Sequence, residues 1–516
     1  MDEYTNASTL LDRNLDQGRA DRTAVITDDG RRLTYADLHS QAGAVAQGLT
    51  DLGVRREERV LLVLDDTPAF PASFLGAMRI GAVPIPTNFL ARAEDFAYFL
   101  DDSYATTTIV DAVFMDKIVP LLAERPHVRL VVANGDPEDA HSLDDWLGGA
   151  AGEVPPVSGH PEDMAFWLYS SGSTGPPKGV VHTHSDIWFT CQTYADEILR
   201  SGPDDIHFST TKLFHAYGLG NSLSFALWAG ATAVYMQGRP APDRALEKIA
   251  TYRPTMLFSV PTLYNLMLND PAIATTDFSS VRQGISAAEP LPPEVWRRFR
   301  DVTGVEILDG IGSTEMLHIY CSNRAGQVKP GSSGVPVSGY EVEIHDEEGR
   351  RLRPGESGEL MVKGGSRFSY YWHRRDKTNT SLHGEWFASG DRYHQDEDGY
   401  LTYEGRVDDM MKVGGLWVSP IEIENRLMEH AAVREAAVVG VPLEGLMQIK
   451  AFVICNGEAG DDLPDMLRNW CKEGLQRYQY PHMVEFVDDF PRTATGKIQR
   501  FKLRADAGQK PGALAP

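Results

Sequence analysis

The chain has 516 residues, which is too long for one compact core and predicts about three folding units. Hydrophobic residues make up 42% and charged residues 24% of the sequence, a globular composition that excludes wholesale disorder. The formal net charge is −24, which disfavours nucleic-acid partners because their phosphates attract cationic surfaces.

Targeting segments and disulfides are not indicated. The N-terminal MDEYTNASTLLDRNLDQ is acidic and lacks the basic and apolar parts of a signal peptide, and no uncharged apolar run could span a bilayer. The cysteines show neither C-x-x-C nor Cys/His metal spacing, which indicates reduced thiols: Cys191, Cys321, Cys455 and Cys471. We expect a cytoplasmic protein that binds no membrane.

Strand-like and helix-like segments alternate through the first two-thirds of the chain. Thr34 is a candidate N-cap for a helix with apolar residues at mostly helical spacing, namely Leu38, Val45, Leu49 and Leu52. A strand is predicted over 59–64, a helix over 71–80 and an extended segment at VPIPTN. Further strands are expected at 107–110, 128–133 and 231–236. This alternation predicts a layered α/β fold with mainly parallel sheets.

The pattern of predicted strands and helices changes twice toward the C-terminus. From about residue 331, EVEIH and ELMVK alternate between Gly-rich turns, which predicts a small β-subdomain. After Gly405, IEIENRLMEH predicts a helix, and REAAVVGVP and IKAFVIC predict strands. We therefore predict a large N-terminal domain over 1–405, a hinge at 406–409 and a small, mobile α/β C-terminal domain over 410–516.

A glycine-rich segment, SSGSTGPPKG at 170–179, follows the predicted strand FWLY. Its open backbone amides, four hydroxyls and Lys178 are the composition of a phosphate-binding loop. It is not a P-loop, because the G-x-x-x-x-G-K-[ST] spacing fails. Taken alone, such a stretch is more often a solvated surface turn.

Further motifs follow this segment in order: SAAEPL at 286–291, GIGSTE at 310–315, SGD at 389–391, GRVDD at 405–409, KVGG at 412–415 and PRTATGK ending at Lys497. Together they closely resemble the signatures of the adenylate-forming enzymes, the superfamily of acyl-CoA synthetases, nonribosomal-peptide adenylation domains and luciferases. LYSSGSTGPPKG, LFHAYGLGN, GIGSTEMLHI and VSPIEIE are most similar to benzoate-CoA and hydroxybenzoate-CoA ligases. The resemblance covers nearly the whole chain and implies that ATP, Mg²⁺ and coenzyme A are used.

The resemblance assigns roles to single residues. Thr314 contacts the α-phosphate of ATP, Glu315 positions Mg²⁺, Asp391 accepts the ribose hydroxyls and Arg406 donates to ribose or phosphate. Lys497 is the expected catalytic cation between the substrate carboxylate and the α-phosphate. The other expected cofactor-binding positions are Ser170, Ser171, Gly172, Ser173, Thr174, Gly175, Lys178, Ala288, Glu289, Pro290, Asp309, Gly310, Ile311, Gly312, Ser313, Lys412, Gly414, Gly415 and Trp417. Singly, Thr314 and Glu315 could instead begin a helix, and Asp391 could form a turn.

The expected acid pocket mixes small residues with aromatic and aliphatic ones: His215, Ala216, Tyr217, Gly218, Ser286, Ala287, His318 and Ile319. Such walls favour a flat slot for a benzene ring, although each apolar member could equally pack in a core. Many relatives place an aromatic residue where Ile311 stands and glycines at Ala287 and Ala288. No Asp occurs between Lys212 and Trp228, which disfavours an α-amino acid substrate.

The family rotates its small domain between its two half-reactions, and Asp408 is the expected pivot. Gly414, Gly415 and Trp417 would then approach the pantetheine channel. We predict an ATP-dependent ligase that converts a small aromatic carboxylic acid to its acyl adenylate and then to its CoA thioester, as a monomer or homodimer. Two alternatives stay open: an aryl-acid adenylation enzyme that loads a carrier protein, and an inactive relative that only binds nucleotide.

Overall fold

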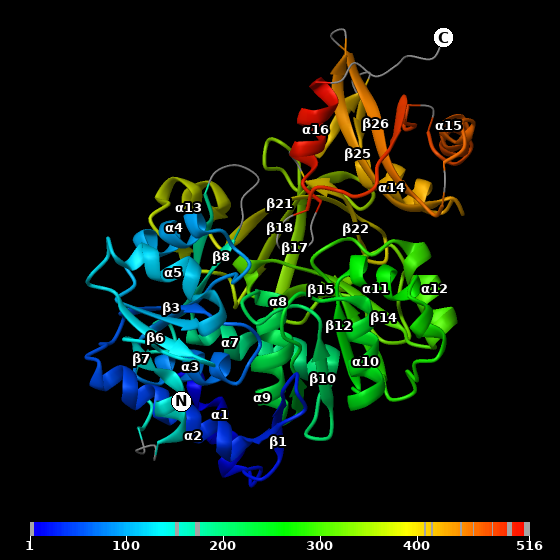
Figure 1. Cartoon of the computed structure of the whole chain (residues 1–516). Helices are drawn as coiled ribbons and strands as arrows, with labels where there is room; N and C mark the ends of the chain where they lie inside the picture. Colours follow the sequence, from blue (N-terminus) through cyan, green and yellow to red (C-terminus); the bar gives the residue numbers. More distant parts are fainter. Residues whose placement is uncertain are drawn as a thin grey trace.

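The computed structural model describes residues 5–149, 154–170, 176–406, 409–413, 416–443, 446–457, 459–476, 478–492 and 498–509. Several predicted site residues lie outside these ranges: Ser171, Gly172, Ser173, Thr174, Gly175, Asp408, Gly414, Gly415 and Lys497. A large N-terminal domain carries a separate, smaller C-terminal domain at one end (Figure 1). The predicted α/β class with parallel sheets is confirmed.

The first sheet is entirely parallel, in the order β4 (Val83–Pro86), β3 (Arg59–Val63), β5 (Thr107–Asp111), β6 (Arg129–Ala133) and β7 (His141–Ser142). The helices in this region are α2 (Tyr35–Asp51), α3 (Ala69–Arg79), α4 (Ala93–Ser103), α5 (Met115–Leu122) and α6 (Leu143–Gly148). Thr34 and Asp37 form a reciprocal capping box that begins α2, as the sequence predicts. The proline-containing β4 lies at the sheet edge, where a missing N–H is tolerated.

The second sheet has nine strands in the order β16 (Val335–Pro336), β15 (Ile319–Ser322), β14 (Ile307–Gly312), β13 (Gln283–Ser286), β12 (Met256–Ser259), β10 (Ile206–Ser209), β11 (Thr232–Val234), β1 (Thr23–Ile26) and β2 (Arg32–Thr34). Its centre, from β1 to β14, is parallel, and both ends are antiparallel. Helices α10 (Pro242–Tyr252), α11 (Pro261–Leu268) and α12 (Pro293–Thr303) share a hydrophobic core with it.

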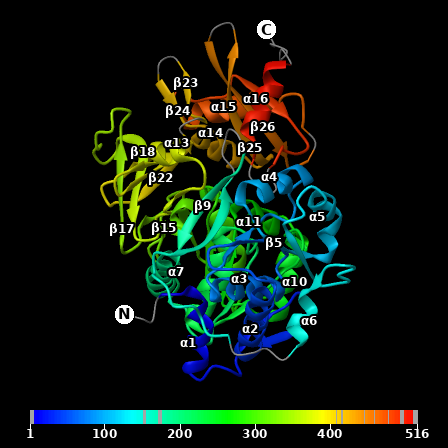
Figure 2. The same ribbon diagram turned by 90° about the vertical axis from the view of Figure 1, so that its left-hand side faces the viewer.

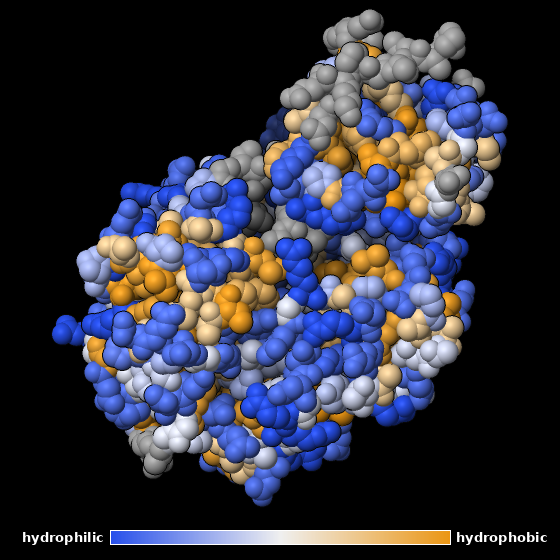
Figure 3. Space-filling view, viewed as in Figure 1, coloured by the Kyte–Doolittle hydropathy of each residue, from blue (hydrophilic) through white to orange (hydrophobic). Residues whose placement is uncertain are grey.

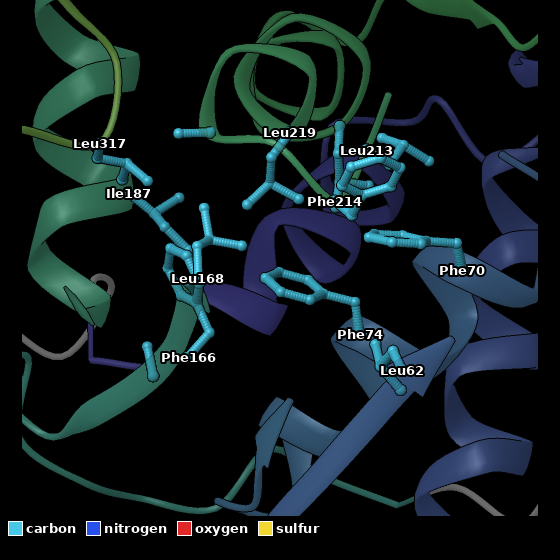
Figure 4. Close-up of a cluster of buried hydrophobic side chains, with 14 of the residues drawn as sticks. Leu62, Phe70, Phe74, Phe166, Leu168, Ile187, Leu213, Phe214, Leu219 and Leu317 are labelled. Atoms are coloured by element: carbon cyan, nitrogen blue, oxygen red, sulfur yellow. The ribbon is translucent and has the colours of Figure 1, made fainter. Parts of the chain in front are cut away.

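A second, larger core joins the first sheet to the rest of the N-terminal domain. The helical segments around it are α1 (Leu10–Asp16), α7 (His184–Thr190), α8 (Ala216–Leu219), α9 (Phe225–Ala229) and the π-helical η4 (Cys191–Leu199) and η5 (Gly220–Ser224). Figure 4 shows Phe74 of α3, Phe166 of β8 (Met164–Ser170), Ile187 of α7 and Leu219 of α8 pointing toward one another. Helix α8 is therefore fixed by packing against several elements.

Two antiparallel sheets complete the N-terminal domain. The first has the order β19 (Tyr370–Tyr371), β9 (Lys178–Thr183) and β8 (Met164–Ser170). The second is the predicted β-subdomain, with β17 (Tyr340–His345), β18 (Ser357–Gly364), β21 (Trp386–Gln395), β20 (Leu382–His383) and β22 (Leu401–Arg406), beside α13 (Arg375–Ser381). Short 3₁₀ turns are η2 (Ala7–Thr9), η3 (Ala112–Phe114), η6 (Pro271–Ala274) and η7 (Thr314–Met316).

The C-terminal domain has hydrophobic cores of its own. Its elements are β23 (Met411–Val413), β24 (Leu416–Val418), α14 (Pro420–Met428), β25 (Val433–Leu443), β26 (Leu446–Cys455), α15 (Leu463–Gly474), β27 (Met483–Phe486) and α16 (Arg500–Gln509). The hinge at 406–409 stays a prediction, since residues 407 and 408 lie outside the described ranges.

The two views in Figures 1 and 2 show this domain standing over the β-subdomain. The surface in Figure 3 is mostly hydrophilic, with scattered apolar patches on both domains. Exposed apolar side chains include Val302 in the large domain and Phe501 in the C-terminal domain. Within the described ranges, no helix has the length and hydrophobicity needed to cross a membrane.

Candidate active site

The glycine-rich segment joins β8 to β9, which pair as an antiparallel hairpin with Ser170 opposite Lys178. The hairpin register therefore brings both ends of the predicted phosphate loop together, although residues 171–175 themselves are not described. The Tyr98 hydroxyl donates to the Pro177 carbonyl at 2.8 Å and fixes the exit of the loop.

The Thr314–Glu315 pair forms the 3₁₀ turn η7 between β14 and β15, capped by Ser313, whose Oγ accepts from Met316 N at 3.2 Å. Three donors from elsewhere hold the carbonyls of this turn. His182 Nε2 lies 2.7 Å from Thr314 O, Phe368 N donates to Glu315 O at 2.7 Å, and the Ser366 hydroxyl donates to Met316 O at 2.8 Å. The turn is thus fixed by three donors from two separate segments, β9 and residues 366–368.

Glu315 and the ends of the glycine-rich hairpin meet at one tyrosine. The Tyr371 hydroxyl donates to Glu315 Oε1 at 2.8 Å, and the Ser170 hydroxyl lies 3.5 Å from the same oxygen. Lys178 Nζ lies 4.3 Å from the centre of the Tyr371 ring. Burial lowers the pKa of Lys178, and the Glu315 carboxylate partly offsets this.

A divalent cation fits this place as a partner of Glu315. Within the described ranges, hydrogen bonds reach only Oε1 of Glu315, which leaves Oε2 for an ion. No cluster of three or more His, Cys, Asp or Glu side chains suited to a metal occurs in that part of the chain. One carboxylate supplemented by phosphate oxygens is a typical Mg²⁺ environment, so the donor set suits a cation that arrives with a nucleotide.

Asp391 and Arg406 face each other on neighbouring antiparallel strands, β21 and β22. Arg406 Nη1 lies 3.1 Å from Asp391 Oδ1, and this carboxylate raises the pKa of the guanidinium. The two predicted ribose-binding residues are therefore held together before any ligand binds, and about half of the Arg406 side chain stays exposed.

Buried polar atoms without partners lie at the end of β13 and in the middle of β14. Ser286 pairs with Asp309 across these parallel strands. Neither Ser286 Oγ nor Asp309 Oδ1 has a hydrogen-bond partner among the described residues. Burial raises the pKa of Asp309 to about 8, although the Ser286 side chain and the backbones of Leu291 and Gly310 lie close enough to oppose the shift. Unpaired buried polar groups cost free energy, so this pair indicates a place for a ligand group that can hydrogen-bond.

The neighbouring residues of SAAEPL and GIGSTE take specific places. Ala288 adopts a positive φ of 76°, which is strained for a residue other than glycine, and Pro290 is exposed. Glu289 Oε2 accepts from the backbone N and hydroxyl of Thr262 at the start of α11, so its carboxylate already has a structural role. Gly310, Ile311 and Gly312 lie on β14 against β15.

The predicted acid-binding residues come from two segments that meet. His215 is the N-cap of α8, and Ala216 and Tyr217 are almost fully buried. The Tyr217 hydroxyl donates to Ile285 O at 3.1 Å, directly before Ser286. His318, before β15, lies against Tyr217 with ring centres 5.5 Å apart, and burial lowers its pKa to about 3, so the imidazole is neutral.

The remaining predicted acid-binding residues of these segments, referred to together as the acid wall, are also buried. Ala287 is 2% and Ile319 1% exposed. Gly218 has a different reason to be small, because a Cβ there would lie 2.1 Å from the Lys212 carbonyl oxygen. Its lack of a side chain is required by packing against the preceding backbone.

In the C-terminal domain, Lys412 and Trp417 pair across the β23–β24 hairpin, whose turn at 414–415 lies outside the described residues. Trp417 is 40% exposed, and Arg392 of the large domain lies 5.6 Å from its ring centre. The hairpin therefore contacts the β-subdomain near Asp391.

Sequence reasoning missed Tyr371 and His182. His182 bridges Asp186, at 2.6 Å, and Thr314. It also missed Lys212, whose ammonium lies 2.9 Å from Asp65 and 3.5 Å from Asp66. Two polar residues directly after a predicted strand, Asp65 and Asp66, were an available signal. Tyr371 lies in the sequence SYYW, which matches none of the motifs used above, so no local pattern pointed to it.

Comparison with known proteins gives two family matches. The model described as AMP-binding enzyme matches residues 11–372, and that of the AMP-binding enzyme C-terminal domain matches residues 422–497. The chain is 45% identical to a benzoate–CoA ligase of Thauera aromatica, over 98% of this chain and 96% of the relative. It is 40% identical to a 4-hydroxybenzoate–CoA/benzoate–CoA ligase of Rhodopseudomonas palustris, over 97% of this chain and 94% of the relative.

Solved structures agree. The anthranilate CoA ligase AuaEII in complex with anthranoyl-AMP superposes with a TM-score of 0.95 at 38% identity, covering 98% of both chains. A benzoate CoA ligase from Burkholderia xenovorans LB400 gives 0.90 at 43% identity, covering 97% of this chain and 99% of that one. Because the first superposition includes both domains, their relative orientation is nearly the same in the two proteins.

Proposed function

The chain belongs to the AMP-binding enzyme family, and from that premise we propose that it is an acid–thiol ligase for a small aromatic acid. It converts benzoate, or a hydroxy- or aminobenzoate, to the acyl adenylate and then to the CoA thioester, with release of AMP and pyrophosphate. The ligase activity and the aromatic acid class agree with the relatives at 45% and 40% identity.

One structural observation carries the proposal. Lys178 and Glu315, from two separate motifs, both contact Tyr371, and Ser170 lies beside Glu315. The Asp391–Arg406 pair lies on the neighbouring sheet. Adenylation joins two anions, a carboxylate and the α-phosphate of ATP, so the site must concentrate cations and hydrogen-bond donors. The convergent side chains supply them.

In the proposed first step, the carboxylate oxygen of the acid attacks the α-phosphorus, an acyl–phosphate bond forms, and the bond to pyrophosphate breaks. Lys178 and the glycine-rich loop hold the β- and γ-phosphates, and Thr314 orients the α-phosphate. Mg²⁺, bound at Glu315, would neutralise phosphate charge. Lys497 bridges the two reacting anions. In the second step, the CoA thiol displaces AMP from the adenylate.

The acid site is assigned to the wall of His215, Tyr217, Ala287, His318 and Ile319. The neutral His318 offers no cation for a second carboxylate, and the wall is predominantly aromatic and aliphatic. A single ring with small uncharged substituents suits it. The unpaired Asp309 oxygen is assigned to the adenine side, and the neighbouring Ser286 hydroxyl to the acid wall.

The test is a substrate panel. With ATP, Mg²⁺ and free coenzyme A, we expect benzoate and its hydroxy or amino derivatives to give AMP and the CoA thioester, and octanoate and palmitate to react poorly. Detection of the thioester by mass spectrometry separates this activity from that of a carrier-loading enzyme, which would stop at the adenylate. A better rate with octanoate than with every benzoate would contradict the acid assignment.

The use of ATP and coenzyme A as co-substrates favours the cytoplasm as the location, and a monomer or homodimer remains the expected state. Light scattering coupled to size exclusion would measure the latter.

A further inference from the structure

Tyr371 lies at the centre of the candidate site and has no role in the reaction as proposed above. It is 3% exposed and belongs to β19, an edge strand that pairs with β9 directly after the glycine-rich hairpin, with Tyr371 opposite Val180. The register therefore places its side chain beside both hairpin ends, although Tyr371 follows Lys178 by more than 190 residues in the sequence.

The Tyr371 side chain makes one contact through its hydroxyl and another through its ring. The hydroxyl donates to Glu315 Oε1 at 2.8 Å, and the ring centre lies 4.3 Å from Lys178 Nζ. Burial and the neighbouring carboxylate raise the pKa of the phenol, so it stays a neutral donor. One side chain thus fixes an anion and a cation at a set distance from each other.

Tyr371 is itself held rigidly. Its backbone N donates to the Thr378 hydroxyl at 3.0 Å, and its ring packs on Phe368 with centres 4.6 Å apart. Phe368 N in turn donates to Glu315 O at 2.7 Å. The segment 368–371 therefore donates hydrogen bonds to both the backbone carbonyl and the carboxylate of Glu315, so the carboxylate has little freedom to rotate.

We propose that Tyr371 is a positioning residue for the nucleotide and its cation: its hydroxyl turns the Glu315 carboxylate so that Oε2 meets the metal, and its ring holds Lys178 at the phosphates. This deepens the proposed function and rests on it only for the identity of the nucleotide. A hydrogen bond to a charged group contributes strongly to orientation, and a cation over a buried ring adds to it.

The substitution Tyr371→Phe removes the hydroxyl and keeps the ring under Lys178. Calorimetric titration with MgATP should show affinity reduced roughly 10-fold, as expected for the loss of one hydrogen bond to a charged group. Titration with ATP in the presence of a chelator should give the affinity of the unmodified protein, because the hydroxyl acts through the metal-binding carboxylate. Tyr371→Leu, which removes the ring as well, should weaken binding in both titrations.

Tyr35→Phe is the matched control. Tyr35 is equally buried, and its hydroxyl donates to two carbonyls, Ala226 O and Ala231 O, away from the candidate site. The Tyr35→Phe substitution should lower thermal stability without changing the affinity for MgATP.

A double-mutant cycle with Glu315→Gln tests whether the hydroxyl acts through the carboxylate. In the Gln background, Tyr371→Phe should have little further effect on MgATP affinity. Additive losses, an unchanged MgATP affinity in Tyr371→Phe, or equal losses with and without Mg²⁺ would each overturn the inference. Since these titrations need no acid or coenzyme A, an unmodified protein that binds MgATP but makes no aryl thioester would refute the proposed function and leave this inference standing.

Discussion

Asp309 is a buried carboxyl whose Oδ1 finds no hydrogen-bond partner among the described residues, beside the equally unpaired Ser286 hydroxyl. Burial raises its pKa from 3.8 to about 8. Below the unfolded pKa both states are protonated and the shift has no effect. As pH rises toward 8, the unfolded chain ionises and the folded chain does not, so stability falls across this window. The group is retained at a cost to stability, as expected for a ligand-binding residue.

We expect Asp309→Asn to raise stability progressively with pH. Asn has nearly the same shape and no ionisation, so the variant lacks the alkaline penalty. The difference in unfolding free energy between variant and unmodified protein should grow by roughly 3 to 4 kcal/mol from about pH 5 to about pH 8. Urea denaturation at both pH values measures it. A difference that does not change with pH would show that Asp309 is ionised in the folded protein.

At the scale of elements, the segment that leads into α8 is fixed to the first sheet by buried charges. Lys212 contacts Asp65 and Asp66, which follow β3, and Asp66 Oδ1 accepts from Leu213 N at 3.1 Å. Burial raises the pKa of Asp66 to about 6, and Lys212 opposes that shift. The polar cluster joins the carboxyl end of a parallel strand to the candidate acid wall. Lys212, which is not itself one of the predicted acid-binding residues, therefore sets the position of His215 and Tyr217.

Lys212→Met should therefore destabilise the protein by roughly 3 to 5 kcal/mol, the usual effect of breaking a buried ion pair. Without the ammonium the pKa of Asp66 rises further, so the loss should be larger at about pH 8 than at about pH 5. Denaturation curves at both pH values give the comparison, and the KM for the acid should rise more than that for ATP.

Lys248→Met is the control for this change. Lys248 is comparably buried and pairs with Asp28 at 2.9 Å, but Asp28 keeps Arg244 at 2.8 Å. Lys248→Met should therefore lower the free energy of unfolding by less than Lys212→Met does, and it should leave the KM for the acid unchanged. Equal effects of the two substitutions would contradict a special role for the Lys212 cluster.

At the scale of the whole molecule, the C-terminal domain has its own cores and meets the large domain at Arg392 of β21, beside the predicted ribose-binding Asp391. Its proposed contribution to adenylation is Lys497. Lys497→Ala should cripple adenylate formation and spare thioester formation from supplied acyl adenylate, because the charge is needed only where carboxylate and phosphate meet.

Pyrophosphate release and thioester formation, assayed separately, distinguish these steps. Lys502→Ala, an exchange of another C-terminal lysine on α16, serves as the control and should leave both unchanged. A Lys497→Ala variant that loses the two half-reactions equally would refute the assignment.

The sequence by itself determined the features that depend on short stretches of chain. The apolar alternation predicted the strands, Thr34 predicted the start of α2, and ordered motifs predicted the family and most candidate residues. These succeed because secondary structure and turns are encoded by residues within a few positions of one another. Position-by-position motif matching also put Asp391 and Arg406 in one site, and the strand register shows them in contact.

Tertiary structure alone decided which side chains support those motifs. His182 meets Thr314 across 132 positions, Lys212 meets Asp65 across 147, and Tyr371 meets Glu315 across 56. Only the tertiary structure shows that backbone packing leaves no room for a side chain at Gly218, and that Glu289 accepts hydrogen bonds at the start of α11. No periodicity or local spacing encodes such contacts, because they depend on how separate sheets pack, and packing is settled only when the whole core forms.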